Sequence, residues 1–288
     1  MRIAIYGSRR QEASAEPIRE FLESLRSKGA TAVMHRKLYR HLYELMPGVL
    51  GVVGTVVDGD DFEADMAVSL GGDGTFLRTA MWVGEKELPI IGVNTGHLGF
   101  LTALPVERLP HLLDELGGDA FRMESRRLLE LVSPCLDVHA APYALNEIAV
   151  TKVETSSMIN ADVSIDGRPL AQYRADGLIV CTATGSTAYN LSVGGPIVQP
   201  TVDVCVLSPV AAHSLSMRPL VVDGSSTIRI VPTGRASHVR VSLDSRYYEI
   251  ETGTTVEIRR APFAVHLLQP AGRSFADTLR DKLHWGEN

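Results

Sequence analysis

The sequence predicts two domains, an N-terminal α/β domain with a parallel sheet and a β-rich C-terminal domain. Strand-like and helix-like apolar patterns alternate over the first third of the chain, which is typical of a parallel α/β sheet. From about residue 104 onward, short runs rich in Val, Ile and Thr follow one another between turns, which indicates a β-rich domain. The 288 residues are enough for about two domains of ordinary size.

Hydrophobic spacing predicts the elements of the first third. Ile18, Phe21, Leu22 and Leu25 recur at helical intervals, and Gly29 follows them as a stop signal. The basic side of a second helical pattern, over 36–45, is interpreted as a solvated face. Together the patterns predict helices at 16–28, 36–45 and 75–83, and strands at 3–6, 31–34, 66–70 and 89–93. In such sheets, ligands bind at the carboxyl ends of the strands.

The remainder of the chain predicts one helix, many strands and a closing tail. The helix covers 105–116, and Asp166–Gly167 is typical of a hairpin turn. Strands are predicted at 128–132, 143–151, 159–165, 177–182, 202–207, 227–231, 239–243 and 255–259. A strand at 264–268 and an amphipathic helix at 274–285 are expected to fold back on the first domain. We therefore assign 1–103 with 265–288 to a Rossmann-like α/β domain, and 104–264 to a β-sandwich-like domain.

Composition argues against several classes of protein. The formal net charge of −6 is unlike that of a general nucleic-acid binder, although a nucleotide ligand needs only local positive charge. No run of 18 apolar residues occurs, and the apolar start is too short for a signal peptide, so no membrane span is expected. Cys135, Cys181 and Cys205 lie in apolar contexts without a Cys-x-x-Cys motif. We interpret them as core residues of a cytoplasmic protein.

The most informative stretch is LGGDGT at residues 70–75, between a strand pattern and a helical pattern. Such a turn offers the N–H groups of a helix N-terminus to phosphate, and its glycines allow close approach. Asp73 is unusual there, because a carboxylate repels phosphate unless it handles a proton, a hydroxyl or a metal ion. We interpret the turn as a phosphoryl-transfer or nucleotide site with a built-in base. A plain tight turn is the alternative, since Asp-Gly is common in turns.

Three further stretches carry polar groups. NTGHLGFL at 94–101 follows the next strand, so two neighbouring strand ends could face one ligand, with His97 as a ligand-facing or a loop-holding residue. DGLIVCTATGSTAYNLS at 176–192 predicts a buried strand that enters a hydroxyl-rich turn, suited to polyphosphate, ribose or adenine, or simply a capped turn. His213 and Arg218 could offer charge to phosphate or hold a loop. No zinc spacing and no Gly-x-Ser-x-Gly elbow occurs.

Together these motifs resemble those of the NAD kinase family, whose members transfer a phosphoryl group from ATP or another donor to the 2′-hydroxyl of NAD. The likeness spans roughly residues 65–220. The GGDGT turn by itself is shared with diacylglycerol kinases and resembles that of 6-phosphofructokinase. Its combination with NTGHLGF at 94–100, LNE at 145–147, Asp176–Gly177 and TGSTAY at 184–189 is far more specific.

The resemblance implies a role for each matched position. Asp73 would be the general base, or the orienting carboxylate, for the ribose 2′-hydroxyl. Phe100 would line the pocket near NAD, Asp176 would contact the nicotinamide side, and Tyr189 would stack on a base. The other implied nucleotide contacts are Gly74, Asn146, Glu147, Thr184, Thr187, Ala188, Asn190, Leu191 and Ser192, and weaker candidates near phosphate are Arg78, Arg174 and His213.

The resemblance also implies substrates and partners. NAD and ATP would be the substrates, and Mg²⁺ or another divalent cation would enter with ATP rather than at a protein metal site. A homodimer or homotetramer is implied, without nucleic acid or membrane. A lipid or sugar kinase that shares the turn, and a non-catalytic NAD(P) sensor, are the alternatives. CTA at 181–183 replaces the family's Ser-Thr-Pro, and Leu101 replaces an aromatic residue of some members, but neither change touches Asp73.

Overall fold

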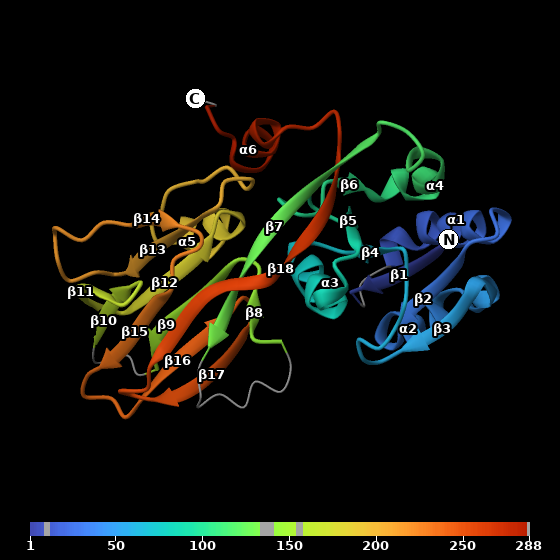
Figure 1. Ribbon diagram of the computed structural model, residues 1–288. Helices are drawn as coiled ribbons and strands as arrows, with labels where there is room; N and C mark the ends of the chain where they lie inside the picture. The colour runs from blue at the N-terminus through green and yellow to red at the C-terminus, as the bar shows by residue number, and fades with distance from the viewer. Residues whose placement is uncertain (9–11, 133–140, 154–157, 287–288) are drawn as a thin grey trace. The chain divides into compact units, whose positions relative to one another are not determined.

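The structure is a computed structural model that describes residues 1–8, 12–132, 141–153 and 158–286. The chain divides into two compact units: unit 1 comprises Met1–Ser125 with Val265–Asn288, and unit 2 comprises Arg126–Ala264. Unit 1 is an α/β domain and unit 2 is built mainly of strands (Figure 1). The predicted fold class is therefore confirmed.

Unit 1 is organised around a parallel sheet. In the order β3-β2-β1-β4-β5, each strand runs parallel to its neighbour. The bounds are β1 (Arg2–Gly7), β2 (Thr31–His35), β3 (Val53–Val57), β4 (Met66–Leu70) and β5 (Pro89–Asn94). Because the strands are parallel, the turns that follow Leu70 and Asn94 emerge at the same edge of the sheet.

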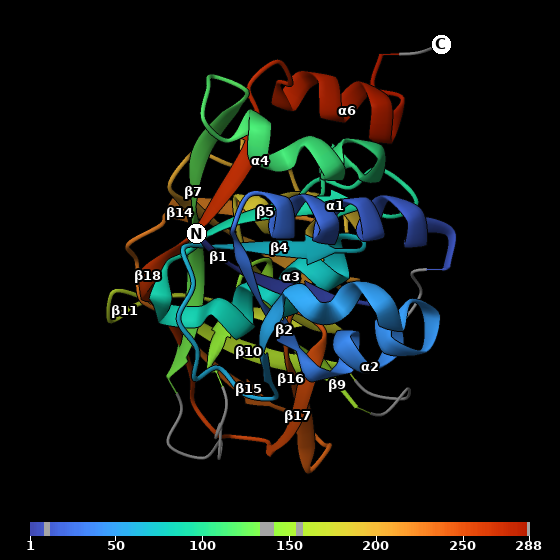
Figure 2. The ribbon, with the colours of Figure 1, turned by 90° about the vertical axis from the view of Figure 1, so that its right-hand side faces the viewer.

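Helices cover the sheet of unit 1 on both faces. Figure 2 shows α1 (Ala15–Ser27) and α2 (Arg36–Leu45) in front of the strands and α3 (Asp73–Val83) behind them. The buried face of α1 consists of the four apolar residues whose spacing predicted the helix. Short 3₁₀ helices complete this part of the chain: η1 (Glu12–Ser14), η2 (Pro47–Val52) and η3 (Gly84–Lys86).

The segment after residue 103 differs from its prediction in both structure and domain. A continuous helix was expected at 105–116, but the structure has β6 (Leu104–Pro105), η4 (Val106–His111) and α4 (Leu112–Glu115). Pro110 lies inside η4, where its missing N–H prevents a regular α-helix. Val106, Leu109 and Leu112 share a hydrophobic core with α1, so residues 104–125 belong to unit 1 instead of the β-rich part.

The C-terminal tail returns to unit 1, as expected. The two strands predicted at 255–259 and 264–268 are one strand, β18 (Val256–Pro270), whose residues 266–268 pair in parallel with β5. The helix α6 (Phe275–Leu283) begins with a capping box made by Ser274 and Asp277. Near its end, the Nζ of Lys282 donates a hydrogen bond to the carbonyl of Leu98.

Unit 2 is a sandwich of two antiparallel sheets. One has the order β14-β13-β12-β9-β16-β17, and the other contains β11-β10-β15 and the first part of β18. The bounds are β7 (Phe121–Val132), β8 (Tyr143–Ala144), β9 (Glu147–Lys152), β10 (Ile159–Ile165), β11 (Arg168–Ala175), β12 (Gly177–Thr182), β13 (Val204–Val210), β14 (Leu220–Asp223), β15 (Ile228–Thr233), β16 (His238–Leu243) and β17 (Arg246–Glu251). Val150 and Leu178 from the first sheet share one core with Val163 and Ile230 from the second.

Several details of unit 2 bear on the predictions. The Asp166–Gly167 turn is confirmed, because both residues have positive φ, 49° and 75°, as the tight turn between β10 and β11 requires. The strand expected at 143–151 is interrupted at Leu145 and Asn146. Cys181 and Cys205 are free and buried, whereas Cys135 lies outside the described residues.

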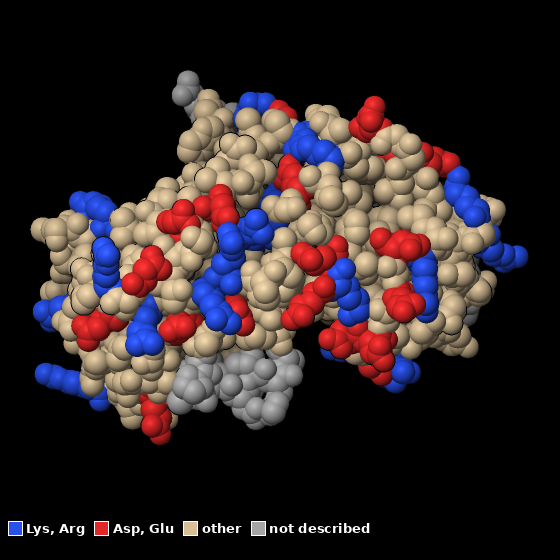
Figure 3. Space-filling model, viewed as in Figure 1, with Lys and Arg blue, Asp and Glu red and all other residues tan. Residues whose placement is uncertain are grey.

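The surface carries charges of both signs. On the face drawn in Figure 3, Lys and Arg are interspersed with Asp and Glu. Among the described residues, no helix has both the length and the apolar character needed to cross a membrane.

Candidate functional site

The glycine turn after β4 is tight and leads directly into the N-terminus of α3. Gly71 has a φ of 149°, and a Cβ there would lie 2.5 Å from Oγ1 of Thr75, so only glycine fits. Gly72 is the N-cap of α3, and its carbonyl accepts the N–H groups of Thr75 and Phe76. The turn therefore places the N-terminus of an 11-residue helix at the carboxyl edge of the sheet, where anions bind favourably.

Asp73, at the start of α3, joins this turn to the second glycine loop. Its Oδ2 accepts a hydrogen bond from the N–H of Phe100 at 2.8 Å, and its Oδ1 accepts from the N–H of Leu101 and from Oγ1 of Thr102, both at 3.0 Å. A Cβ at Gly99 would lie 1.9 Å from the same Oδ1, so this approach requires glycine. The two glycine loops therefore contact each other through Asp73.

The other predicted residues of unit 1 lie around this junction. Gly74 is exposed, and Phe100 is partly exposed. Arg78 lies one turn further along α3, where it is exposed and donates to Oγ1 of Thr75 at 3.1 Å. His97 is exposed at the tip of the second loop. The junction thus offers an exposed glycine backbone, a cation and an aromatic ring.

The Asn146–Glu147 pair of unit 2 stands on a loop that is held from two sides. Asp244, in the turn between β16 and β17, accepts the backbone N–H groups of Leu145, Asn146 and Glu147 at 2.9, 2.8 and 3.1 Å. On the other side, Oγ1 of Thr182 donates to the carbonyl of Leu145 at 2.7 Å. These bonds explain why the strand expected at 143–151 is interrupted here. The backbone groups that would pair with a neighbouring strand bond instead to the side chains of Asp244 and Thr182.

Glu147 is an almost fully buried carboxyl with an unsatisfied oxygen. Only 7 % of the residue is exposed, and its Oε2 has no hydrogen-bond partner among the described residues. Burial and, to a smaller extent, the neighbouring charge of Asp244 raise the pKa of Glu147 to about 8, although a hydrogen bond from the backbone of Tyr189 opposes them. The Asn146–Glu147 pair and the 184–192 turn therefore meet at Glu147.

The hydroxyl-rich turn divides into a buried and an exposed side. It consists of η5 (Thr184–Thr187) and α5 (Tyr189–Ser192). A Cβ at Gly185 would lie 2.1 Å from the carbonyl of Asn146, so the turn packs directly on the Asn146 loop. Tyr189 is 40 % exposed and Ser192 is also exposed, while the partly exposed members are Thr187, Ala188 and Leu191.

Asn190 and Thr184 occupy the buried side. The Nδ2 of Asn190 donates to the carbonyls of Ser186 and Pro196, and its Oδ1 accepts from Oγ of Ser208 at 2.6 Å. With no exposed surface, the Asn190 side chain does not face a ligand here, in contrast to its implied role as a contact. Thr184 accepts a hydrogen bond from the buried Arg126. Both side chains fix the shape of the turn.

Asp176, Arg174 and His213 come together at the junction of β11, β12 and β13. The N–H of His213 donates to the carbonyl of Arg174 at 2.9 Å, and the N–H of Asp176 donates to that of Val210. The Asp176 carboxylate forms an ion pair with Lys152 at 2.7 Å. Lys152 is a residue that sequence reasoning missed, because only the antiparallel pairing of β9 with β12 brings it to Asp176.

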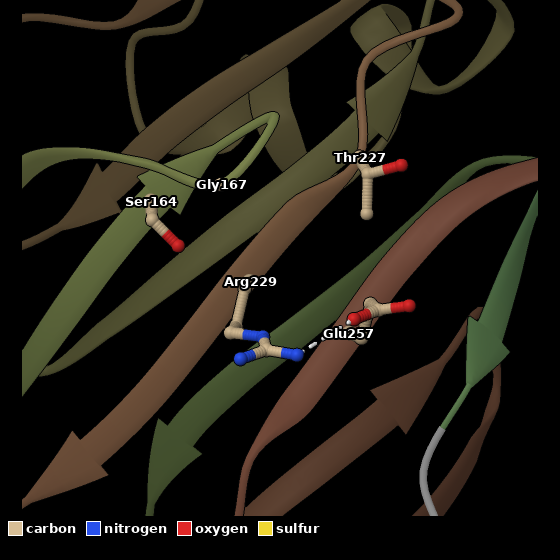
Figure 4. A pocket seen from close by; sticks show the side chains of 5 residues that line it. All are labelled: Ser164, Gly167, Thr227, Arg229 and Glu257. Carbon is tan, nitrogen blue, oxygen red and sulfur yellow. Dashed lines mark hydrogen bonds and ion pairs between the residues drawn. The ribbon is translucent and has the colours of Figure 1, made fainter.

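A hollow of about 270 Å³ lies elsewhere on unit 2, between β10, β15 and β18 (Figure 4). Its Arg229 points toward Glu257, and the two form an ion pair at 3.3 Å. None of the residues that line it belongs to the predicted site. Among the described residues, no three His, Cys, Asp or Glu side chains gather to hold a metal ion.

Unit 1 has a parallel sheet with an acid-bearing glycine turn at a helix N-terminus, and unit 2 is a β-sandwich with a buried glutamate beside an exposed tyrosine. These features are typical of a phosphotransferase that acts on nucleotides. Comparison with known families agrees. The ATP-NAD kinase N-terminal domain matches residues 5–120, and the ATP-NAD kinase C-terminal domain matches residues 145–269. The chain belongs to the NAD kinase family, as its motifs predict.

Curated relatives support the same assignment, and solved structures share the fold. The NAD kinase of Porphyromonas gingivalis is 39 % identical over 99 % of this chain and 98 % of its own, and that of Bacteroides fragilis is 38 % identical with the same coverage. The fold is similar to that of yeast NADH kinase complexed with NADH, with a TM-score of 0.88, 23 % identity and coverage of 100 % of this chain and 89 % of that one. The fold is also similar to that of an NAD kinase from Archaeoglobus fulgidus in complex with ATP, with a TM-score of 0.73 and 23 % identity. That match covers 99 % of this chain and 98 % of the other chain.

Proposed function

We propose that this chain transfers the γ-phosphoryl group of ATP to the 2′-hydroxyl of the adenosine ribose of NAD, giving NADP and ADP. The observation that carries the proposal is the position of Asp73 at the N-terminus of α3, anchored by the loop of Phe100. Phosphoryl transfer depends mainly on positioning and charge neutralisation, so a fixed carboxylate beside a phosphate turn is what this reaction needs.

Asp73 retains the capacity to act on a hydroxyl. A carboxylate has about four acceptor positions, and three of those on Asp73 are taken by Phe100, Leu101 and Thr102. Among the described residues, two of these bonds go to Oδ1 and one to Oδ2, so a further acceptor position remains on Oδ2. We assign that position to the ribose 2′-hydroxyl. Asp73 would orient the hydroxyl and accept its proton as the new P–O bond forms and the bond to ADP breaks.

The metal ion would come with the donor. Mg²⁺ binds through few carboxylates and several phosphate oxygens, so ATP itself would supply most of its ligands. When bound to ATP, it would neutralise charge on the transferred group. The exposed Arg78 and the amides of the turn would add to that effect from the protein side.

Residues of unit 2 would recognise the nucleotide. Asn146 and Glu147 would bind ribose hydroxyls, and the exposed ring of Tyr189 would stack on a base. Asp176, held by Lys152, would contact the nicotinamide side, with Arg174 and His213 near phosphate. The remaining contacts to the adenosine portion would come from Thr187, Ala188, Leu191 and Ser192. A cytoplasmic location, which the free buried cysteines favour, and a homodimer or homotetramer complete the proposal.

A substrate panel tests this function. The purified chain is given ATP and Mg²⁺ with NAD, NADH, a diacylglycerol or a sugar phosphate, and ADP release is followed together with the phosphorylated product. We expect product from the dinucleotides alone. Phosphorylation of the lipid or the sugar phosphate, with NAD left unchanged, would contradict the proposal, and NAD binding without turnover with any donor, including polyphosphate, would favour a sensor.

A further inference from the structure

Asp244 lies outside every motif that predicted the function, yet it makes three hydrogen bonds to one of them. It stands in the hairpin turn between β16 and β17 with a φ of 50°. Its Oδ1 accepts from the N–H groups of Asn146 and Glu147, and its Oδ2 accepts from that of Leu145. Hydrogen bonds to a charged acceptor are stronger than neutral ones, so this is a firm clamp on three consecutive residues.

We propose that Asp244 is a positioning residue for NAD, because it fixes the backbone of Asn146 and Glu147 in the orientation in which their side chains meet the nucleotide. The inference rests on the proposed function, which makes NAD the ligand of these two residues. Asp244 would not touch NAD itself. It would act through the loop, and through its charge beside the Glu147 carboxyl.

The geometry of Glu147 shows why its orientation matters. The N–H of Tyr189 bonds to the carboxyl, while Oε2 is buried and has no partner among the described residues. A buried polar atom without a partner costs free energy, and a ligand hydroxyl would remove that cost. The 184–192 turn packs on the neighbouring carbonyl of Asn146, so a shift of the loop would displace both ligand-facing segments together.

The charges around Glu147 give Asp244 a second effect. Among the described residues, the titratable groups beside Glu147 are Asp244 from the β16–β17 turn and Cys181 from β12, whose thiol is kept neutral by burial. Arg246, at the start of β17, lies close to Asp244. Burial raises the pKa of Asp244, but three N–H donors and Arg246 act against it, whereas Glu147 has one N–H donor. Because Asp244 accepts three backbone N–H groups and Glu147 accepts one, we place the negative charge of the pair on Asp244 and, near neutral pH, the proton on Glu147. A protonated Glu147 can donate to a ribose oxygen.

Asp166 provides a matched control within the same unit. It also stands in a hairpin turn with positive φ, at 49°, and its carboxylate also caps a neighbouring segment, through the N–H of Thr227 and Oγ of Ser226. Asn tolerates this backbone conformation well, so Asp166→Asn and Asp244→Asn change the same chemistry in the same kind of turn. Only the segment that is held differs.

The test measures NAD binding by calorimetry and the kinetic constants of both substrates for the wild type, Asp244→Asn and Asp166→Asn. In Asp244→Asn one carboxylate oxygen becomes an NH₂ group, which cannot accept a backbone N–H. We expect the Kd and KM for NAD to rise about tenfold, as for the loss of one charge-assisted hydrogen bond, with KM for ATP nearly unchanged. Hydrogen exchange of the Leu145, Asn146 and Glu147 amides should accelerate in this variant only.

The pH dependence of NAD binding separates positioning from a purely structural effect. In the wild type, NAD affinity should fall above about pH 8, as Glu147 loses its proton. In Asp244→Asn the fall should begin at lower pH, because the adjacent negative charge is gone. Glu147→Gln, which stays neutral, should show no such fall. Asp166→Asn should follow the wild type throughout.

The outcomes distinguish this inference from the proposed function. Wild-type NAD affinity and pH profile in Asp244→Asn would overturn the inference while leaving the kinase activity in place. A wild-type chain that binds NAD with the expected profiles but forms no NADP would contradict the function and support the clamp. If Asp244→Asn fails to fold, Glu147→Gln decides, because a retained fall of affinity above about pH 8 in that variant would overturn the inference.

Discussion

The N–H of Phe100 donates a hydrogen bond to the Asp73 carboxylate at 2.8 Å, which ties the glycine turn after β4 to the glycine loop after β5. The two residues are 27 positions apart and lie in the segments that follow β4 and β5, which are neighbouring parallel strands of one sheet. The Asp73 side chain therefore fixes the loop that carries the Phe100 ring, and the same hydrogen bonds fix the position of the Asp73 carboxylate. The proposed catalytic carboxylate is held before any substrate arrives.

Gly99→Ala should damage this junction selectively. The added Cβ would lie 1.9 Å from Oδ1 of Asp73, and overpacking of this kind costs about 1–3 kcal/mol or displaces the carboxylate. We expect kcat for NADP formation to fall by about tenfold or more. Gly96→Ala in the same loop is the control, because apart from its chain neighbours a Cβ there has no atom of the described residues within 4 Å. Equal activity of the two variants would show that the contact with Asp73 is unimportant.

Tyr189→Ala should weaken NAD binding. The ring is 40 % exposed, and stacking on a base contributes about 1–3 kcal/mol in other proteins. Titration calorimetry should therefore show an affinity for NAD that is roughly five- to 150-fold lower. Tyr189→Phe keeps the ring and should bind nearly as tightly as the wild type. Similar losses in both variants would assign the effect to the hydroxyl group instead of stacking.

Glu147→Gln should stabilise the protein without ligand at neutral and alkaline pH. The folded-state pKa of Glu147 is raised from 4.5 to about 8, so the folded state binds more protons between these values. The stability of the wild type is therefore full below about pH 4.5 and decreases as pH rises toward about 8. Urea unfolding should give the variant an advantage of about 4 kcal/mol near pH 8 that largely disappears near pH 4.5. A constant difference across this range would contradict the assignment of the proton to Glu147.

His35 should make the protein sensitive to acid. Its Nδ1 caps α2 by accepting the N–H of Lys37, and its ring lies 4.6 Å from that of Tyr6. Burial, then the charge of Lys37, lower the pKa of His35 from 6.5, so the unfolded state takes up the proton first as pH falls. The stability that His35 contributes is present above about pH 6.5 and is lost below it. His35→Asn, which can still cap the helix, should show a smaller loss of melting temperature between about pH 7.5 and about pH 5.5; an equal loss would contradict this reasoning.

The sequence predicts elements with a strong apolar pattern and misses those at the edges of sheets. The bounds predicted for α2, β4, β10 and β12 agree with the structure, because α2 and β10 have a regular apolar spacing and β4 and β12 are apolar runs buried along their whole length. β3, β11, β14 and β17 were not predicted. They are outer strands of their sheets and expose much of their length, which removes the apolar alternation on which prediction depends.

The site shows the same limit for long-range contacts. Asp73, the second glycine loop and the Tyr189 turn follow from local motifs, since each is a short segment with unusual composition. Asp244 could not be found this way, because it lies 97 residues or more from the N–H groups that it accepts. Its only local signal is an Asp in a turn, and Asp166 gives the same signal without any link to the proposed site.

NADP formation by the wild type and by Asp73→Asn, with NAD, ATP and Mg²⁺, tests the central claim most directly. Loss of a general base typically lowers kcat by about 10²–10⁴-fold, and NAD should still bind, because its proposed contacts come mainly from unit 2. Thr102→Val, which removes one hydrogen bond to Asp73 but keeps the carboxylate, should lose much less activity. We predict robust NADP formation by the wild type and almost none by Asp73→Asn. A kcat near that of the wild type in Asp73→Asn would contradict the account.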